Sequence, residues 1–195
     1  GKLFAISLWA LSRVQVVRDV AVGSCDMTLR IRNVVCVTGY VVLSDINSRM
    51  LVNGRDRVID SGYVDGIGFA QADAEQLPFA RATFDCICIS FGLRNVTNKE
   101  RALRSMYELL KPGGRVVILE FSEMANKKLS ALYDLYSFKV LPRLGEVFAN
   151  DAPSYRYLAE SIRKHPNQLA LITLLRSAGF EQCSYQNLSA GIVAI

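Results

Sequence analysis

Apolar runs alternate with segments of helical spacing along much of the chain. Five runs predict strands, at residues 16–21, 40–45, 67–72, 85–90 and 115–120. Stretches such as VVL, CICIS and VVILE are apolar at nearly every position, which is typical of strands buried on both faces. This alternation predicts a mostly parallel, doubly wound α/β sheet that binds ligands at the carboxyl ends of its strands.

Two segments between these strands have the spacing of an amphipathic helix, at residues 47–58 and 98–110. In the second segment we expect one buried apolar stripe, with Asn98 as the N-cap. The stripe consists of Ala102, Leu103, Met106, Leu109 and Leu110. The KPGG sequence at residues 111–114 then ends the helix and turns the chain into the next strand.

After Glu120 the pattern changes to longer helical segments. Residues 127–148 and 155–164 predict helices of a lid, inserted at about residues 123–165. A helix at residues 168–178, ended by Gly179, comes next. Residues 180–187 and 191–195 then predict an antiparallel hairpin that closes a single domain spanning residues 1–195.

Composition narrows the class of protein. The chain has 195 residues, 51% of them hydrophobic, and a net charge of +5, so it can bury one core and is too apolar for disorder. Charge-free stretches such as residues 3–12 and 33–44 are well short of the roughly 20 residues that span a bilayer. Residues 1–11 lack a small-residue cleavage site, so we expect no secretory signal and a cytoplasmic location.

The cysteines and the single histidine indicate no metal centre. There are five cysteines, an odd number without a CxxC pair, which favours reduced thiols over a disulfide framework. Cys86 and Cys88 alternate along a predicted strand and should therefore be buried on one face. His165 has no cysteine near it, so we expect no zinc site. Nucleic-acid binding is not expected either, because no known binding motif and no dense basic run is present.

Three weak signals for an adenosine-type ligand follow successive strands. Gly23 lies in a loop after the first strand, where backbone N–H groups and a helix N-terminus can face a nucleotide-like group. Asp45 ends the second strand, 22 residues beyond Gly23, where an acid can bind ribose hydroxyls or, alternatively, cap the next helix. Asp73 follows the third strand, and an exocyclic amine can bind there under cover of Leu77 and Phe79. Their order supports an adenosine site more strongly than any one of them.

Long segments of the sequence resemble one family. They are VVLSDIN (41–47), ADAEQLPF (72–79), FDCICISFGLRNV (84–96), KERALRSMYELLKPGGRVVILEFS (99–122) and NDAPSYRYLAESIRKHP (150–166). These segments are similar to the UbiE family, the S-adenosylmethionine-dependent C-methyltransferases of ubiquinone and menaquinone biosynthesis. The resemblance extends over essentially the whole chain, although about the first fifth of a typical member has no counterpart. It implies a Rossmann-like class I methyltransferase sheet.

The resemblance also implies roles for individual residues. The positions that match cofactor-binding residues are Gly23, Ser24, Asp45, Asp73, Ala74 and Ser90. Ser24 lies beside the methionine end of S-adenosylmethionine, Asp45 at the ribose and the Asp73–Ala74 pair at the adenine. Ser90 lies on the other flank of the cofactor.

Arg94, Asp151, Tyr155 and Arg156 match positions that face the quinol. A quinol attacks through its ring carbon best as a phenolate. Arg94 can stabilise this phenolate, and Asp151 can accept the proton that the quinol hydroxyl loses. Arg94 alternatively makes a structural pair. His165 is more consistent with a cation at a helix end than with a base.

The glycine loop departs from the family pattern. Members read Ala-Gly-Gly-Thr-Gly-Asp, whereas this chain has Ala21-Val22-Gly23-Ser24-Cys25-Asp26. A β-branched Val22 at positive φ would cost at least about 1 kcal/mol. One alternative is therefore a catalytically weak relative that binds other quinone-pathway proteins as a scaffold. A dinucleotide oxidoreductase is disfavoured by the missing GxGxxG.

The implied substrate, a polyprenylated quinol, is dissolved in the bilayer. We therefore expect reversible, salt-sensitive peripheral contact with the inner membrane, driven by the basic balance of the chain. Clusters such as Lys127–Lys128 and the aromatic Tyr133, Tyr136 and Phe138 are more consistent with a solvated turn and helix packing than with membrane or quinone contacts.

Overall fold

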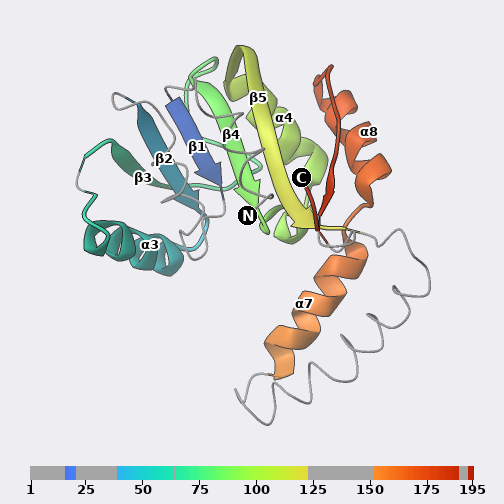
Figure 1. Ribbon diagram of the computed structural model, residues 1–195, viewed down its shortest axis with the longest axis horizontal. Helices are drawn as coiled ribbons and strands as arrows, with labels where there is room; N and C mark the ends of the chain where they lie inside the picture. The colour runs from blue at the N-terminus through green and yellow to red at the C-terminus, as the bar shows by residue number, and fades with distance from the viewer. Residues whose placement is uncertain (1–15, 21–38, 64, 123–151, 189–192) are drawn as a thin grey trace.

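A computed structural model describes residues 16–20, 39–63, 65–122, 152–188 and 193–195 (Figure 1). The helix predicted at residues 127–148 lies outside these residues, as do Gly23, Ser24, Asp151 and the altered glycine loop. The extent of the predicted lid therefore stays a prediction. Among the helices described, none is long and apolar enough to cross a membrane.

The described strands form one seven-stranded sheet in the order β3-β2-β1-β4-β5-β7-β6. The five parallel strands are β1 (Val16–Val20), β2 (Tyr40–Asp45), β3 (Ile67–Gln71), β4 (Phe84–Ser90) and β5 (Leu110–Phe121). Two short strands, β7 (Val193–Ala194) and β6 (Asn187–Leu188), extend the sheet beyond β5 in antiparallel pairings. The predicted mostly parallel sheet with an antiparallel C-terminal hairpin is confirmed.

The described helices are α3 (Ser48–Asp60), α4 (Lys99–Leu109), α7 (Ala152–Lys164) and α8 (Gln168–Ala178), and a 3-10 turn, η1 (Leu93–Asn95), follows β4. Helices α4 and α8 pack against each other, whereas α7 projects away from the sheet and contacts η1 at one end (Figure 1). Helix α7 thus meets the body of the domain beside the carboxyl end of β4.

Local signals place most element ends where the sequence predicts them. The Asn98 side chain accepts a hydrogen bond from the Arg101 N–H at 2.9 Å, as expected of an N-cap. The apolar stripe of α4 is buried, and Gly179 ends α8 at φ +113°. These helices therefore follow from capping chemistry and from one apolar face each.

Two predicted boundaries are wrong. Strand β5 begins at Leu110, not Arg115, because Leu110 already pairs with Phe84 and the KPGG segment crosses an irregularity in the ladder. Gly113, at φ +78°, accommodates this irregularity. The closing hairpin is also much shorter than predicted, with two residues in each strand.

Buried side chains form two apolar clusters. The larger cluster lies beneath α4 and α8 and includes Phe84, Ile87, Ile89 and Met106. The smaller one contains Cys86 and Cys88, whose Sγ atoms lie 3.8 Å apart as free thiols. The hydrogen bond with Cys86 and burial raise the pKa of Cys88 well above its usual value, so this thiol stays protonated. The prediction of two buried thiols on one face is confirmed.

Replacing Gly179 with alanine should destabilise the protein by about 2–4 kcal/mol. A Cβ there would lie 2.8 Å from Cζ of Tyr107, whose ring packs edge-on against Phe180, and the positive φ adds strain. The control is Gly62→Ala, since Gly62 also has positive φ but a Cβ there would have no atom within 4 Å, so only about 1 kcal/mol is expected. Equal urea midpoints for the two variants would contradict the proposed clash.

Candidate cofactor and substrate site

The carboxyl ends of the parallel strands lie along one edge of the sheet. Val20 at the end of β1 is in register with Ser44 of β2 and Ile89 of β4, and Asp45 is in register with Gln71 of β3. The turn after β3, Asp45 and Ser90 therefore follow one another along this edge, at strand ends as the sequence predicts. Ligands of open α/β sheets bind at such an edge.

Asp45 is half-buried at the last position of β2. Its Oδ1 accepts a hydrogen bond from the Asn47 N–H at 2.8 Å, and the cap of α3 is Asn47, whose side chain accepts from the Arg49 N–H at 2.9 Å. Within the described residues, Oδ2 of Asp45 makes no hydrogen bond. Asp45 thus orients the start of α3 and retains a carboxylate oxygen for a hydroxyl donor.

Asp73 begins a tight turn after β3. Its Oδ1 accepts from the Glu75 N–H at 2.9 Å, and its carbonyl oxygen accepts from the Gln76 N–H at 3.1 Å. Glu75 in turn accepts from the Asn98 N–H at 2.8 Å, which fixes the turn to the start of α4. The exposed Asp73 carboxylate is therefore held in place by the backbone, with the half-buried Ala74 beside it.

These residues fit the adenosine part of S-adenosylmethionine. A ribose offers two hydroxyl donors and adenine an exocyclic amine, and the carboxylates of Asp45 and Asp73 supply acceptors at adjacent strand ends. Ser90 is half-buried at the end of β4, on the far side of β1 from Asp45.

A buried ion pair lies at the same edge, between β5 and η1. The Nη1 of Arg94 donates to Oε1 of Glu120 at 2.9 Å, and the Arg94 backbone N–H donates to Oε2 at 3.1 Å. Glu120 also accepts from the Phe121 N–H at 3.0 Å. The side chains are 13% and 3% exposed, so Arg94 is held in one orientation, as the structural alternative predicts.

Backbone strain and ring packing accompany this pair. Phe91 has φ +53°, although it is not glycine, and its carbonyl oxygen accepts a hydrogen bond from Arg94 Nη1. The Phe121 ring lies 4.9 Å from that of Phe91 and 5.3 Å from the Arg94 guanidinium carbon. Strain of this kind, of order 1–3 kcal/mol, is concentrated in proteins at ligand sites. The Nε of Arg94 is buried without a partner among the described residues.

His165 lies just beyond α7, close to the same pair. Burial, and then the charges of Lys99 and Arg94, lower the pKa of His165 to about 4. Its ring is therefore neutral at neutral pH, which corrects the expectation of a helix-end cation. Burial also lowers the pKa of Lys99, against the opposing charge of Glu120. Nδ1 of His165 is buried and has no partner in the described part of the chain.

Helix α7 is joined to η1 by a tyrosine that the sequence does not single out. The Tyr157 hydroxyl donates to Oδ1 of Asn95 at 3.0 Å. Of the predicted quinol-facing residues, Arg156 is exposed on α7, and Tyr155 lies on the same helix with only its backbone described. Asp151 is outside the described residues, so its position relative to Arg94 stays a prediction.

Three functional candidates are missing from the sequence prediction, namely Asp19, Lys99 and Glu120. Asp19 is 1% exposed in β1, and Glu120 is 3% exposed near the end of β5. The signal was an acid beside strongly apolar strand positions, in VVRDV and VVILE, because such a residue is rarely buried without a partner. Lys99 had no such signal.

Comparison with solved structures supports the fold. A putative methyltransferase from Bacillus halodurans superposes with a TM-score of 0.71 at 20% identity, over 95% of this chain and 72% of that one. A SAM-dependent methyltransferase from Aquifex aeolicus gives a TM-score of 0.70 at 14% identity, over 97% and 84% of the two chains. The predicted class I methyltransferase fold is confirmed.

Sequence comparison gives the family. The family model described as ubiE/COQ5 methyltransferase matches residues 2–195. The ubiquinone/menaquinone biosynthesis C-methyltransferase UbiE of Methylococcus capsulatus is 56% identical over 194 residues, which cover 100% of this chain and 78% of that protein. The protein of the same name from Escherichia coli is 54% identical, over 100% and 77%. The chain therefore belongs to the ubiE/COQ5 family of methyltransferases.

Proposed function

We propose that this protein transfers the methyl group of S-adenosylmethionine to a ring carbon of a polyprenylated quinol in ubiquinone or menaquinone biosynthesis. The observation that carries the proposal is the juxtaposition along one sheet edge. Two carboxylates at the adjacent ends of β2 and β3 suit an adenosine. The Arg94–Glu120 pair lies on the other side of β1, at the ends of β4 and β5. The names of relatives that are 54–56% identical agree with this reaction and this class of substrate.

Six residues would hold the cofactor. They are Gly23, Ser24, Asp45, Asp73, Ala74 and Ser90. When bound, S-adenosylmethionine supplies an electrophilic methyl group on a sulfonium. Asp45 and Asp73 would bind the ribose and the adenine amine, because each keeps a carboxylate oxygen beyond the one that its own turn uses. Gly23 and Ser24 would contact the methionine end.

Arg94, Asp151 and Tyr155 would serve the quinol. The Arg94 guanidinium stays charged at any physiological pH. It can therefore stabilise a phenolate but cannot accept the proton of the quinol hydroxyl. Its buried Nε, which has no partner among the described residues, is a donor that a quinol oxygen could satisfy. Asp151 would accept the proton, directly or through water, and Tyr155 would border the ring. Glu120 contributes by holding Arg94 in place rather than by touching the substrate.

A second function follows from the altered glycine loop. With Val22 and Cys25 in place of two glycines, the chain could serve as a catalytically weak scaffold for other quinone-pathway proteins. Calorimetric titration with S-adenosylmethionine separates the two functions. The methyltransferase binds it, and restoring Val22→Gly and Cys25→Gly should tighten that binding. A chain that shows no binding heat, with or without the two glycines, is the scaffold.

We also propose peripheral contact with a membrane surface that presents the quinol. Arg163 and Lys164 are exposed in the last turn of α7, near the site, and the chain carries a net charge of +5. Attraction to anionic lipid headgroups is screened within about 10 Å at 0.1 M salt, so this contact would be reversible and salt-sensitive. Flotation with anionic vesicles at low and high salt tests it.

Asp45→Asn should weaken binding of S-adenosylmethionine by about 1.5–3 kcal/mol, the scale of a hydrogen bond to a charged group. The amide keeps an oxygen for the Asn47 N–H, so the start of α3 is preserved while the charge at the ribose is lost. Calorimetry gives the affinity. Asp60→Ala, which removes an exposed acid at the far end of α3, is the control and should bind normally. Unchanged affinity in Asp45→Asn would remove Asp45 from the site.

Arg94→Lys should lower turnover while leaving the affinity for S-adenosylmethionine unchanged. A lysine keeps the positive charge beside Glu120 but loses the planar guanidinium, whose Nη1 also donates to the Phe91 carbonyl. Turnover with a quinol and calorimetry on the same preparation give the two values. A drop of several kcal/mol in the free energy of unfolding, with turnover intact, would show that the pair is only structural.

His165 should make the protein less stable as the pH falls. Its folded pKa of about 4 lies below the ordinary 6.5, so between these values the unfolded chain binds a proton that the folded chain does not. The stabilising effect is complete above pH 6.5 and is lost as the pH falls toward 4. The ring is only partly buried, so solvent screening reduces the expected loss to about 1–2 kcal/mol.

Urea unfolding of the parent and His165→Asn at about pH 7.5 and about pH 4.5 measures this effect. The parent should lose more stability than the variant over this interval, because all other titrating groups are shared. Parallel pH dependences in the two proteins would contradict a buried, neutral His165.

A further inference from the structure

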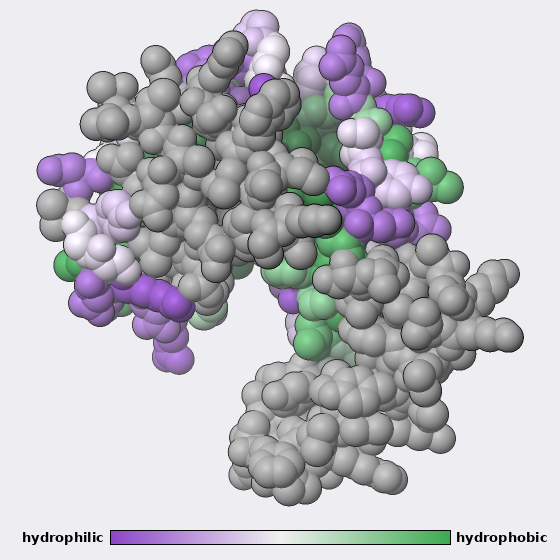
Figure 2. All heavy atoms as spheres, in the orientation of Figure 1, coloured by the Kyte–Doolittle hydropathy of each residue, from purple (hydrophilic) through white to green (hydrophobic). Residues whose placement is uncertain are grey.

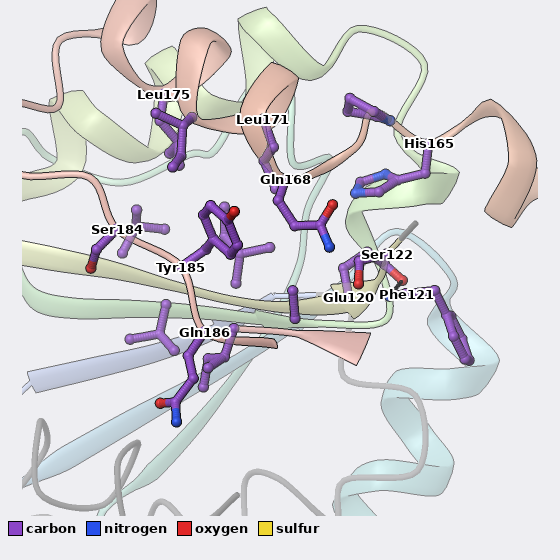
Figure 3. A pocket seen from close by; sticks show the side chains of 17 residues that line it. Glu120, Phe121, Ser122, His165, Gln168, Leu171, Leu175, Ser184, Tyr185 and Gln186 are labelled. Atoms are coloured by element: carbon purple, nitrogen blue, oxygen red, sulfur yellow. Dashed lines mark hydrogen bonds between the residues drawn. The ribbon is translucent and has the colours of Figure 1, made fainter. Parts of the chain in front are cut away.

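A cavity of about 490 Å³ lies between α8 and the outer strands of the sheet. Its floor includes Val116 and Ile118 of β5, and Leu171 and Leu175 of α8 form its roof (Figure 3). In the space-filling view, hydrophobic side chains show in the hollow beside α8 (Figure 2). The volume is within the range of roughly 300–1,000 Å³ that is usual for ligand pockets, and well above the voids of a packed core.

Polar groups are gathered at one end of this cavity. Glu120, Ser122, His165 and Gln168 lie together where β5 ends and α8 begins (Figure 3). Because His165 is neutral, Glu120 is, among the described residues that line the cavity, the only one whose side chain bears a formal charge at neutral pH, and Arg94 pairs with it. The cavity therefore suits an uncharged, mainly hydrocarbon ligand with one polar end, and it disfavours a phosphate or a nucleotide.

The polar end adjoins the proposed quinol site. Glu120 and Phe121 line the cavity and also contact the guanidinium of Arg94, by the ion pair and by the ring face. The buried Nδ1 of His165, which has no partner in the part of the chain described, lies at this end too. Glu120 and Phe121 thus belong to both sites, so a chain attached to a ring beside Arg94 would start next to the cavity.

We propose that this cavity holds the first isoprene units of the substrate's tail, so that the space under α8 selects prenylated over tail-less quinols. This inference rests on the proposed function. At about 30 Å³ for each carbon-sized group, close to the share of a water molecule in the liquid, the cavity holds on the order of 15 carbons, or about three isoprene units. Longer tails would extend from the cavity toward solvent or lipid.

The tail also accounts for the incomplete packing of α8. Leu171, Ile172 and Leu175 are only half-buried, although they face the sheet side of the helix at the cavity. Water is poorly stabilised between these apolar side chains, because it finds few hydrogen-bond partners there. Burial of a hydrocarbon chain instead removes apolar surface from water on both partners.

Ile172→Trp tests the proposal, because the indole would fill the cavity. Ile172 lies outside the buried core cluster, so the larger side chain should be tolerated. The control is Leu169→Trp, the same kind of change on the same helix at a side chain that is 67% exposed and does not line the cavity. Ser184→Phe, on the opposite wall and exposed, gives a second blocking variant should Ile172→Trp unfold. Melting without ligand checks the folding of each.

Two measurements are made on each protein. The first is the rise in melting temperature on adding farnesol, an isoprenoid alcohol about as long as the cavity, since a ligand stabilises only the state that binds it. The second is the KM for a prenylated quinol and for a quinol with no tail, with S-adenosylmethionine saturating. We expect farnesol to stabilise the parent and Leu169→Trp but not the blocking variants. In the blocking variants KM should rise about tenfold or more for the prenylated quinol and stay unchanged for the tail-less one.

The outcomes separate this inference from the proposed function. Methylation of prenylated quinol with the same KM in parent and blocking variants, and equal melting shifts with farnesol, would overturn the tail site and leave the methyltransferase intact. Stabilisation by farnesol that the blocking variants abolish, in a chain that methylates neither quinol, would support the tail site and refute the proposed reaction.

Discussion

The buried ion pair between Arg94 and Glu120 is the interaction on which the proposed quinol site of this protein depends. A carboxylate that is 3% exposed near the end of a parallel strand would be costly without a partner, so Glu120 requires Arg94. It accepts from the guanidinium and from two backbone N–H groups, which fixes η1 to β5. The pair thereby fixes a permanent cation beside the ends of β4 and β5, where we propose that the quinol binds.

The pair also contributes to the protonation of its neighbours. Burial lowers the pKa of His165 most, and the positive charges of Lys99 and Arg94 lower it further, so this imidazole stays neutral at neutral pH. Glu120 offsets part of the cost that burial imposes on charged Lys99. A single carboxylate among three basic side chains therefore leaves one formal positive charge in excess, a suitable setting for a phenolate but not for a second cation.

The fold was predictable because it depends on local signals. Apolar runs mark the five parallel strands, Asn98 caps α4 and Gly179 ends α8, so pattern and capping chemistry suffice. The start of β5 and the length of the hairpin were missed because ladder pairing, a non-local interaction, decides them. At the site, Asp45, Asp73 and Ser90 follow from strand ends. The partners of Arg94 and the Tyr157–Asn95 hydrogen bond depend on contacts between distant segments, which a single sequence does not reveal.

Methyl transfer by in-line displacement needs an acceptor carbon held in line with the sulfonium and shielded from water. The sheet places the proposed cofactor residues and the proposed quinol residues on opposite sides of β1. Asp45 and Asp73 lie on the β2–β3 side of β1, whereas Arg94 and Glu120 lie on the β4–β5 side, so the cofactor and the quinol can approach each other along the edge. Phe91, strained at φ +53°, and Phe121 supply apolar cover beside the arginine. Positioning by rigid strand ends, with charge placed by one buried pair, is thus what we propose that this fold contributes to methyl transfer.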